Sequence, residues 1–104
     1  MSSKAAFIAD LLRKGQTVER YKEGGNSMLP LLKSNQPVTL TPVDEETELS
    51  IDDVVFCRVK GRYVTHKIHA LRGSQFQIGN MRGFMNGWVT RDKIFGKVTH
   101  IWDK

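Results

Sequence analysis

One serine near the N-terminus has the surroundings of a nucleophile. It lies in a Gly-Asn-Ser-Met-Leu-Pro run, in which Gly25 leaves room at the bend, Met28 anchors the turn and Pro30 stiffens its exit. A turn of this kind can direct the hydroxyl of Ser27 and the backbone N–H groups of Asn26 and Ser27 into one pocket. Those N–H groups would hold the oxyanion that forms when a serine attacks a carbonyl.

A base for this serine is expected about forty residues downstream, where a predicted strand carries His66 and Lys67. A serine hydroxyl needs a base within hydrogen-bond reach before it becomes reactive. Neighbouring strand residues point to opposite faces, so only one of the two can face Ser27. Val64 and Ile68 make the face of His66 mainly apolar, which favours His66 as the inward candidate. Imidazoles have a reference pKa of about 6.5, whereas a lysine near 10.4 must be strongly desolvated before it accepts a proton, so Lys67 is the alternative base.

Ordinary structural roles also account for these residues. A Ser-Met turn occurs in many loops, a histidine on an apolar face is usually a hydrogen-bonded core residue, and Lys67 fits an exposed strand position. Cys57 is the single cysteine of the chain, which excludes an internal disulfide, and its strand-like surroundings favour a small buried hydrophobe. Cysteine and histidine spacings do not fit a zinc site, so we expect no metal and no cofactor.

With 104 residues, the chain has the size of one domain, which we divide into an N-terminal amphipathic helical part (1–16) and a β part (17–104). A helix is expected over residues 4–14, with Ser2 or Ser3 as its N-cap and Gly15 after its end. Its apolar face comprises Phe7, Ile8, Leu11 and Leu12.

Short β-prone runs separated by Gly, Pro and Asn/Asp predict a mainly β fold after the helix. The expected strands are 17–22, 37–41, 53–60, 63–70, 75–79 and 94–102. The clearest hairpin turns at Gly61-Arg62, as a type II′ turn with glycine first. In its first arm Val55, Cys57 and Val59 are expected on the core side, with Arg58 and Lys60 toward solvent. The glycine-rich stretch 79–87 is predicted to form a folded loop.

Charge is unevenly distributed along the chain, whose formal net charge is +5. Residues 44–53 hold six acidic residues and no basic one, whereas residues 54–91 hold seven Lys/Arg and no acidic one. The acidic segment can neutralise the basic sheet, or the sheet can be a polyanion-binding face. A nucleic-acid surface would use Arg58, Lys60, Arg62, Lys67 and Arg72, with Phe84 or Trp88 for stacking.

The motifs around Ser27 and His66 resemble those of the serine peptidase superfamily that includes type I signal peptidases and self-cleaving LexA-type repressors. The resemblance covers about residues 20–100. Four pieces carry it in the same order: Gly25–Pro30 is similar to the G-x-S-M-x-P nucleophile box, Leu49–Val55 to a box that usually ends G-D-V-V, Val64–Ile68 to the strand of the general base, and Ile94–Val98 to the closing strand.

The resemblance implies a small coiled β-sheet, or partly open barrel, with a Ser27–His66 dyad at one edge. His66-Lys67 is similar to the branch with a histidine base followed by arginine. That branch usually has an acidic residue where this chain has Asn80, an amide that can orient the imidazole but cannot stabilise imidazolium as a carboxylate does. Asp52 stands in place of a usual glycine, and Asp53 is expected to be a structural turn residue.

Two function classes follow from the residues and the resemblance. The first is a cytoplasmic serine endopeptidase that cuts or recognises an extended peptide, without a transmembrane anchor or a DNA-binding domain. The second is a catalytically inactive module of the same fold, of phage or mobile-element origin, that binds a protein partner. A nucleic-acid partner through the basic residues is a third hypothesis.

Overall fold

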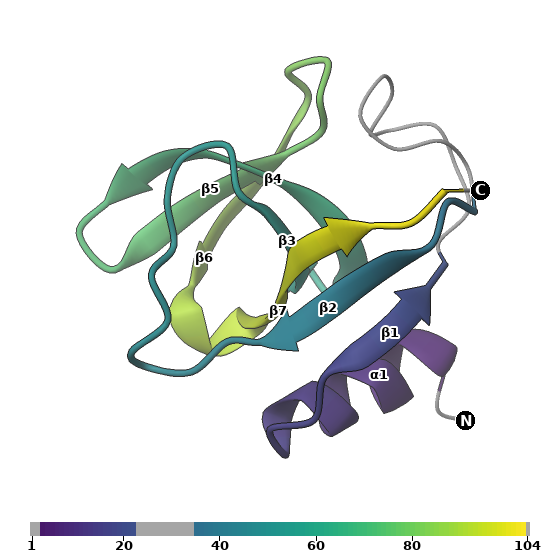
Figure 1. The fold of residues 1–104 in the computed structure, drawn as a ribbon. Helices are drawn as coiled ribbons and strands as arrows, with labels where there is room; N and C mark the ends of the chain where they lie inside the picture. The colour runs from purple at the N-terminus through teal and green to yellow at the C-terminus, as the bar shows by residue number, and fades with distance from the viewer. Residues whose placement is uncertain (1–2, 23–34, 104) are drawn as a thin grey trace.

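The computed structural model describes residues 3–22 and 35–103. Within these residues the chain forms one α-helix, seven β-strands and one 3₁₀ turn (Figure 1). The elements in chain order are α1 (Lys4–Arg13), β1 (Val18–Tyr21), β2 (Val38–Pro42), β3 (Val54–Val59), β4 (Arg62–Arg72), β5 (Gln75–Gly79), β6 (Met85–Thr90), η1 (Arg91–Lys93) and β7 (Ile94–Ile101).

All seven strands belong to one antiparallel sheet with the order β1-β2-β7-β3-β4-β5-β6. The strand β7 lies in the middle, between β2 and β3, although it is the last in sequence. The sheet curls, so that α1 lies against the β1-β2-β7 part and the hairpins β3-β4 and β5-β6 form the other part (Figure 1). The expectation of a mainly β fold with one short N-terminal helix is therefore confirmed.

Two apolar clusters fill the molecule. One lies under α1 and includes Leu12, Leu40 and Phe56, and the other includes Val55, Cys57, Val59, Ile68 and Ile78. Since neighbouring residues of β3 enter different clusters, this strand is buried on both faces. The expected inward positions of Val55, Cys57 and Val59 are confirmed, and Arg58 and Lys60 are exposed as expected.

The helix α1 has the predicted caps. Ser3 Oγ accepts a hydrogen bond from the N–H of Ala6 at 3.1 Å, and Gly15 adopts a φ of +86°, which favours glycine. Leu12 is buried against the sheet, whereas Phe7, which the sequence placed on the apolar face, is 59% exposed. That part of the prediction was wrong, because the sheet covers only the side of the helix that carries Ile8, Ala9 and Leu12.

The β3-β4 hairpin turns one residue earlier than predicted. Lys60 and Gly61 both have positive φ, of 51° and 79°, and Val59 pairs with Arg62. Two positive φ angles are the signature of a type I′ turn rather than of the type II′ turn expected at Gly61-Arg62. The observed register places Tyr63 opposite Arg58, whose guanidinium carbon lies 5.3 Å from the centre of the tyrosine ring.

The strand β6 was not predicted, since residues 79–87 were expected to form a loop. Only residues 80–84 form a turn, in which the side-chain oxygen of Asn80 accepts hydrogen bonds from the N–H groups of Arg82 and Phe84. From Met85 onward the chain pairs with β5, despite an irregular φ of +146° at Gly87. Cross-strand pairing has here overridden a weak local β propensity.

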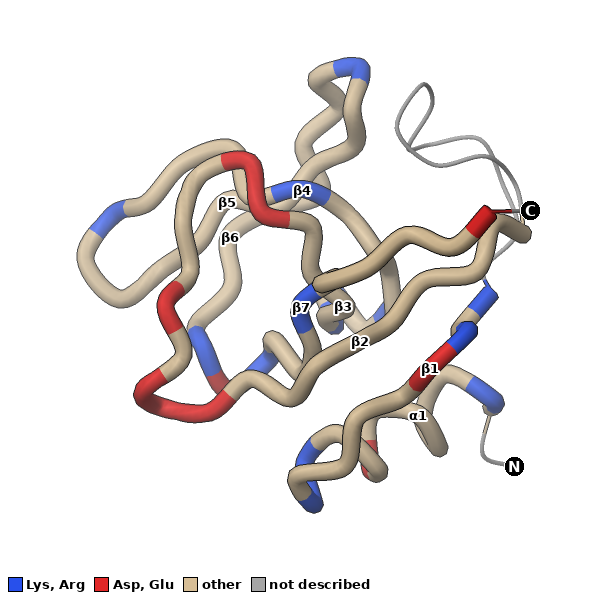
Figure 2. Tube along the Cα trace, in the orientation of Figure 1, with Lys and Arg blue, Asp and Glu red and all other residues tan. Residues whose placement is uncertain are grey.

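The acidic segment is tied to the basic sheet by specific contacts. Lys67 pairs with Asp52 at 3.1 Å and Lys97 with Asp53 at 3.3 Å, and Arg91 donates to the backbone oxygens of Asp44 and Thr47. Figure 2 shows the acidic stretch at the turns of one end of the molecule. Part of the basic charge is thus neutralised locally. No helix in the described part of the chain is both long and apolar enough to cross a membrane.

Candidate functional site

The predicted nucleophile segment falls in residues 23–34, outside the described residues. This applies to the proposed nucleophile Ser27, to the oxyanion donor Asn26, and to the supporting residues Gly25, Met28 and Pro30. Their roles remain predictions from the sequence. The described residues define the position of the candidate base and the surfaces around it.

His66 is a buried residue in the middle of β4. It lies opposite Val55 of β3 and keeps 7% of its surface exposed, in agreement with the strand-face argument. Its ring nitrogen Nδ1 lies 2.7 Å from the side-chain oxygen of Asn86, on β6. Because an amide oxygen only accepts, this contact favours the tautomer with the proton on Nδ1 and leaves Nε2 as the basic nitrogen.

The residue that orients His66 is thus Asn86, which sequence reasoning missed. Asn80, the expected orienting residue, instead uses its side-chain oxygen to close the 80–84 turn. Its backbone oxygen lies 2.8 Å from Nε2 of another histidine, His69. Asn86 escaped notice because residues 79–87 were read as a loop, where the side-chain direction cannot be inferred from strand alternation.

Lys67, the alternative base, extends to the other side of β4. Its ammonium nitrogen pairs with a carboxylate oxygen of Asp52 at 3.1 Å. This ion pair holds the ammonium group of Lys67 at Asp52, on the face of β4 opposite to that of His66. Of the two candidate bases, His66 is therefore the one that faces the side chain of Asn86.

Asp53 has the contacts of a structural turn residue. Its carboxylate accepts from the N–H of Ser50 at 2.8 Å and pairs with Lys97 at 3.3 Å. Its backbone oxygen accepts from the N–H of Ile68 at 2.9 Å, two residues beyond His66 in β4. Asp53 thus ties the turn before β3 to the central part of the strand that carries His66.

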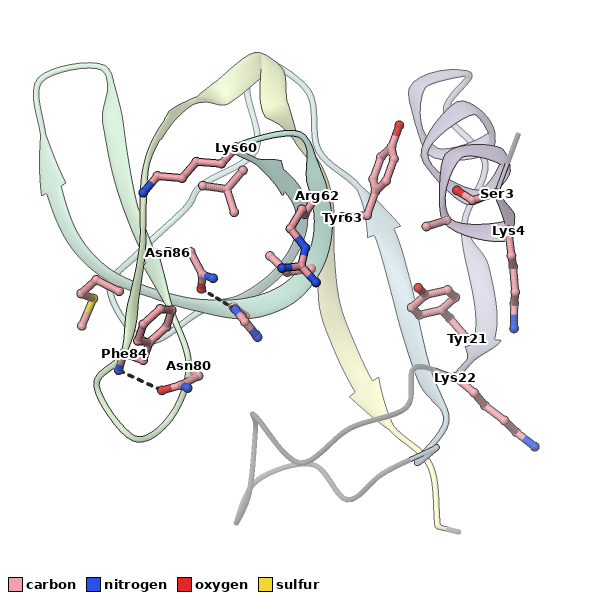
Figure 3. Close-up of a pocket in the computed structure, with 15 residues that line it drawn as sticks. Ser3, Lys4, Tyr21, Lys22, Lys60, Arg62, Tyr63, Asn80, Phe84 and Asn86 are labelled. Atoms are coloured by element: carbon pink, nitrogen blue, oxygen red, sulfur yellow. Dashed lines mark hydrogen bonds between the residues drawn. The ribbon is translucent and has the colours of Figure 1, made fainter. Parts of the chain in front are cut away.

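His66 and Asn86 line an open cavity of about 810 Å³ between α1 and the β3-β4 and β5-β6 hairpins (Figure 3). Apolar parts of its wall come from Val59, Val64, Phe84 and Met85. Lys22, the last described residue before residues 23–34, also lines it. The described residues that precede 23–34 therefore end at the wall of this cavity.

The turn that carries Phe84 of the cavity wall packs against a glycine in β5. A methyl group at Gly79 would lie 2.6 Å from the backbone oxygen of Phe84 and 2.8 Å from the sulfur of Met85. The backbone oxygen of Phe84 also accepts a hydrogen bond from the N–H of Asn80 at 2.9 Å. Gly79 therefore permits the 80–84 turn to fold back closely onto β5, beside the cavity.

Cations dominate the charged part of the cavity wall. The lining includes Lys4, Lys22, Lys60 and Arg62 and contains no aspartate or glutamate among the described residues. Figure 3 shows Lys60 and Arg62 on the side of the β3-β4 turn, and Lys4 and Lys22 on the side of α1 and β1. An occupant of this cavity meets a positive potential.

The basic residues considered for nucleic acid do not form one uniform surface. Arg58 lies over Tyr63, and the guanidinium carbon of Arg72 lies 4.3 Å from the centre of the Trp88 ring. Lys67 is held by Asp52. One face of the tryptophan expected to stack on bases is therefore covered by an arginine of the chain itself.

The described residues contain no group of three or more His, Cys, Asp or Glu side chains that could hold a metal ion. Cys57 is fully buried, as its surroundings in the sequence indicated. Comparison of the chain with protein-family models gives no match, and comparison with curated protein sequences gives none either.

Proposed function

We propose that this protein is a serine peptidase with Ser27 as nucleophile and His66 as general base. The observation that carries the proposal is the buried His66, held through Nδ1 by Asn86 on the wall of an open cavity that Lys22 also lines. A histidine whose one nitrogen is fixed by an acceptor presents the other as a base, which is the arrangement that activates serines.

In the proposed mechanism, Ser27 Oγ attacks the scissile carbonyl while Nε2 of His66 takes its proton. The N–H groups of Asn26 and Ser27 stabilise the oxyanion. The imidazolium then gives the proton to the leaving amine, and water hydrolyses the acyl-enzyme by the same route. Asn86 is a positioning residue, because it acts on the reaction through the ring of His66.

The sheet supports the finer assignment to the signal peptidase and LexA type. In this proposal the curled antiparallel sheet of the described residues corresponds to the coiled sheet of that superfamily. Asp52 has a φ of +79°, a conformation that glycine adopts freely, in keeping with the glycine that the superfamily has at this position. An extended peptide would bind by adding a strand beside the cavity, where β6 is an edge strand of the described sheet.

Digestion of a mixed peptide library tests this function. The purified protein should produce new peptide termini that mass spectrometry detects, and Ser27→Ala and His66→Ala should each abolish them. His69→Ala is a matched control, since this half-buried histidine of the same strand contacts Asn80 rather than Asn86. Cleavage by either of the first two variants at the parental rate would eliminate the mechanism.

The second candidate function is a binding module that keeps the fold without the chemistry. It is favoured by the amide of Asn86, which cannot stabilise imidazolium as a carboxylate does, and by the exposure of Phe84 (66%) and Phe7 (59%). Such a module would hold its protein partner equally well after Ser27→Ala and would lose it after Phe84→Ala. A partner that dissociates from Ser27→Ala but stays on Phe84→Ala would exclude this candidate.

A further inference from the structure

Among the described residues, the charged side chains that line the cavity of the candidate base are all cationic. Lys60, in the β3-β4 turn, and Arg62, at the start of β4, line the same cavity as His66, and Lys4 and Lys22 complete its cationic lining. The ion pairs that the described residues form engage other lysines, namely Lys14, Lys67 and Lys97. The acidic segment thus pairs with Lys67 and Lys97, and the described lining of this cavity stays cationic.

The backbone of the β3-β4 turn fixes the position of Lys60. It occupies the first position of the type I′ turn with a φ of +51°, and its stem passes over Gly87 of β6. A methyl group at Gly87 would lie 3.4 Å from Cε of Lys60 and from Cγ2 of Val59. The lysine stem therefore lies against β6 at Gly87, beside the cavity that Lys60 lines.

A second cavity continues the positive surface beyond Lys60. It has a volume of about 380 Å³, and its wall includes Lys60, Arg58 and Lys93 but no acidic residue among those described. Lys60 therefore belongs to both cavities. The two cavities, which share the side chain of Lys60, are together called the cationic groove.

The apolar lining indicates a peptide as occupant. Val59, Val64 and Met85 line the same cavity as the cationic residues and His66. An extended peptide alternates its side chains, so it can place an apolar side chain near His66 and acidic ones toward Lys60 and Arg62. A nucleic acid would instead stack its bases on several exposed aromatic faces. Of the two aromatic residues considered for stacking, Phe84 is exposed, whereas Trp88 already has Arg72 on one face.

We propose that the substrate is an acidic peptide, in which carboxylates flank the bond presented to His66 and are selected by Lys60 and Arg62. This inference rests on the proposed function, and it names the substrate class of the same site. Exposed cations contribute modest affinity individually, but a groove of one sign steers and orients a ligand of the opposite sign. Peptides with basic flanks are repelled by the same groove.

Binding to the Ser27→Ala variant tests the substrate class separately from catalysis. The probes are fluorescein-labelled peptides with one alanine-rich centre, flanked by glutamates, by glutamines or by lysines, and binding is followed by anisotropy at several salt concentrations. We expect the glutamate peptide to bind about tenfold more tightly than the glutamine peptide, with the difference shrinking as salt rises. Lys60→Gln/Arg62→Gln should abolish this preference.

The matched control is Lys14→Gln/Arg72→Gln, which makes the same change of net charge outside the lining of either cavity. It should keep the preference. Equal binding of the glutamate and glutamine peptides, or an equal loss in both double variants, overturns the proposal. An oligothymidylate that binds more tightly than the glutamate peptide also overturns it, in favour of nucleic acid.

Failure of the proposed function gives a different pattern. If the parent protein binds glutamate peptides selectively but never cuts them, the peptidase assignment fails and the acidic-peptide specificity of the groove is retained. If the parent protein cuts peptides without regard to acidic flanks, the peptidase assignment holds and the substrate class is wrong.

Discussion

At the scale of single residues, the contact between His66 and Asn86 defines the chemistry available to the site. The amide oxygen fixes the ring and its tautomer at 2.7 Å. It carries no charge, however, so it cannot stabilise the imidazolium that forms when His66 takes a proton. A serine activated by this pair should therefore react, but slowly compared with one activated by a full triad.

A carboxylate in place of the amide should raise the reactivity. We expect Asn86→Asp to increase the acylation rate of Ser27 at neutral pH at least about tenfold, because the carboxylate stabilises imidazolium. Asn86→Leu, which removes the acceptor at similar volume, should lower it by a comparable factor. Stopped-flow kinetics with an activated ester measures both. A slower Asn86→Asp and an unaffected Asn86→Leu would show that Asn86 does not position the base.

The candidate base was predictable from the sequence, whereas its partner was not. Strand alternation places His66 with Val64 and Ile68, and this assignment needs only the period of two. Asn86 lies after two glycines and an asparagine, in a segment with weak β propensity, and it becomes a strand residue only through pairing with β5. A contact between two residues of different hairpins depends on the whole sheet.

At the scale of elements, a close contact joins α1 to the centre of the sheet. Leu12 is 1% exposed and lies over Gly96 of β7, where a methyl group would come within 2.9 Å of its Cδ1. Gly96 pairs with both Pro42 of β2 and Phe56 of β3. The absence of a side chain at this position lets the helix pack closely on the sheet.

This contact predicts a non-additive pair of substitutions. Gly96→Ala should destabilise the fold by about 1–3 kcal/mol through overpacking, and Leu12→Ala by about 2–5 kcal/mol through loss of buried surface. The double variant should be more stable than the sum of the two, because the new methyl group fills part of the space that Leu12 leaves. Urea unfolding of the four proteins measures this coupling. Strict additivity would mean that the two side chains do not meet.

The elements themselves were largely predictable, and the errors have physical causes. The helix and six of the strands follow from caps, apolar periodicity and turn residues, with ends shifted by one or two residues. The hairpin at Lys60 and Gly61 was placed one residue late because a non-glycine residue with positive φ is rarely expected. Phe7 is exposed because the sheet beneath α1 covers only part of the apolar face of the helix. The apolar pattern of the helix carries no information on the width of the sheet.

At the scale of the whole molecule, the uneven distribution of charge along the sequence gives the surface an acidic region and a basic region. The acidic segment is held to the sheet by Arg91, Lys67 and Lys97. Within it, hydrogen bonds lower the pKa of Asp44 below its usual value, first from the N–H of Glu46 and then from the hydroxyl of Thr47. In the cationic groove, Lys60 and Arg62 take part in none of the ion pairs among the described residues and can contact a ligand.

The lowered pKa of Asp44 predicts an acid-dependent contribution to stability. A depressed folded-state pKa stabilises the fold above the unfolded-state value of about 3.9, and this contribution is lost as pH falls through the folded-state pKa. The urea midpoint of Asp44→Ala should therefore lie below that of the parent at neutral pH and approach it below about pH 4. Glu45→Ala is the control for charge. A gap between parent and Asp44→Ala that widens on acidification would contradict the assignment.

The central claim is that Ser27 and His66 act together, and covalent labelling tests it without knowledge of the substrate. The protein is treated with a serine-directed acylating probe between about pH 6 and 9, and the adduct is mapped by mass spectrometry. The account predicts an adduct on Ser27, absent from Ser27→Ala, whose rate falls about a hundredfold or more in His66→Ala and stays unchanged in His69→Ala. An adduct on Ser27 that forms equally fast without His66, or no adduct in a folded sample, would contradict it.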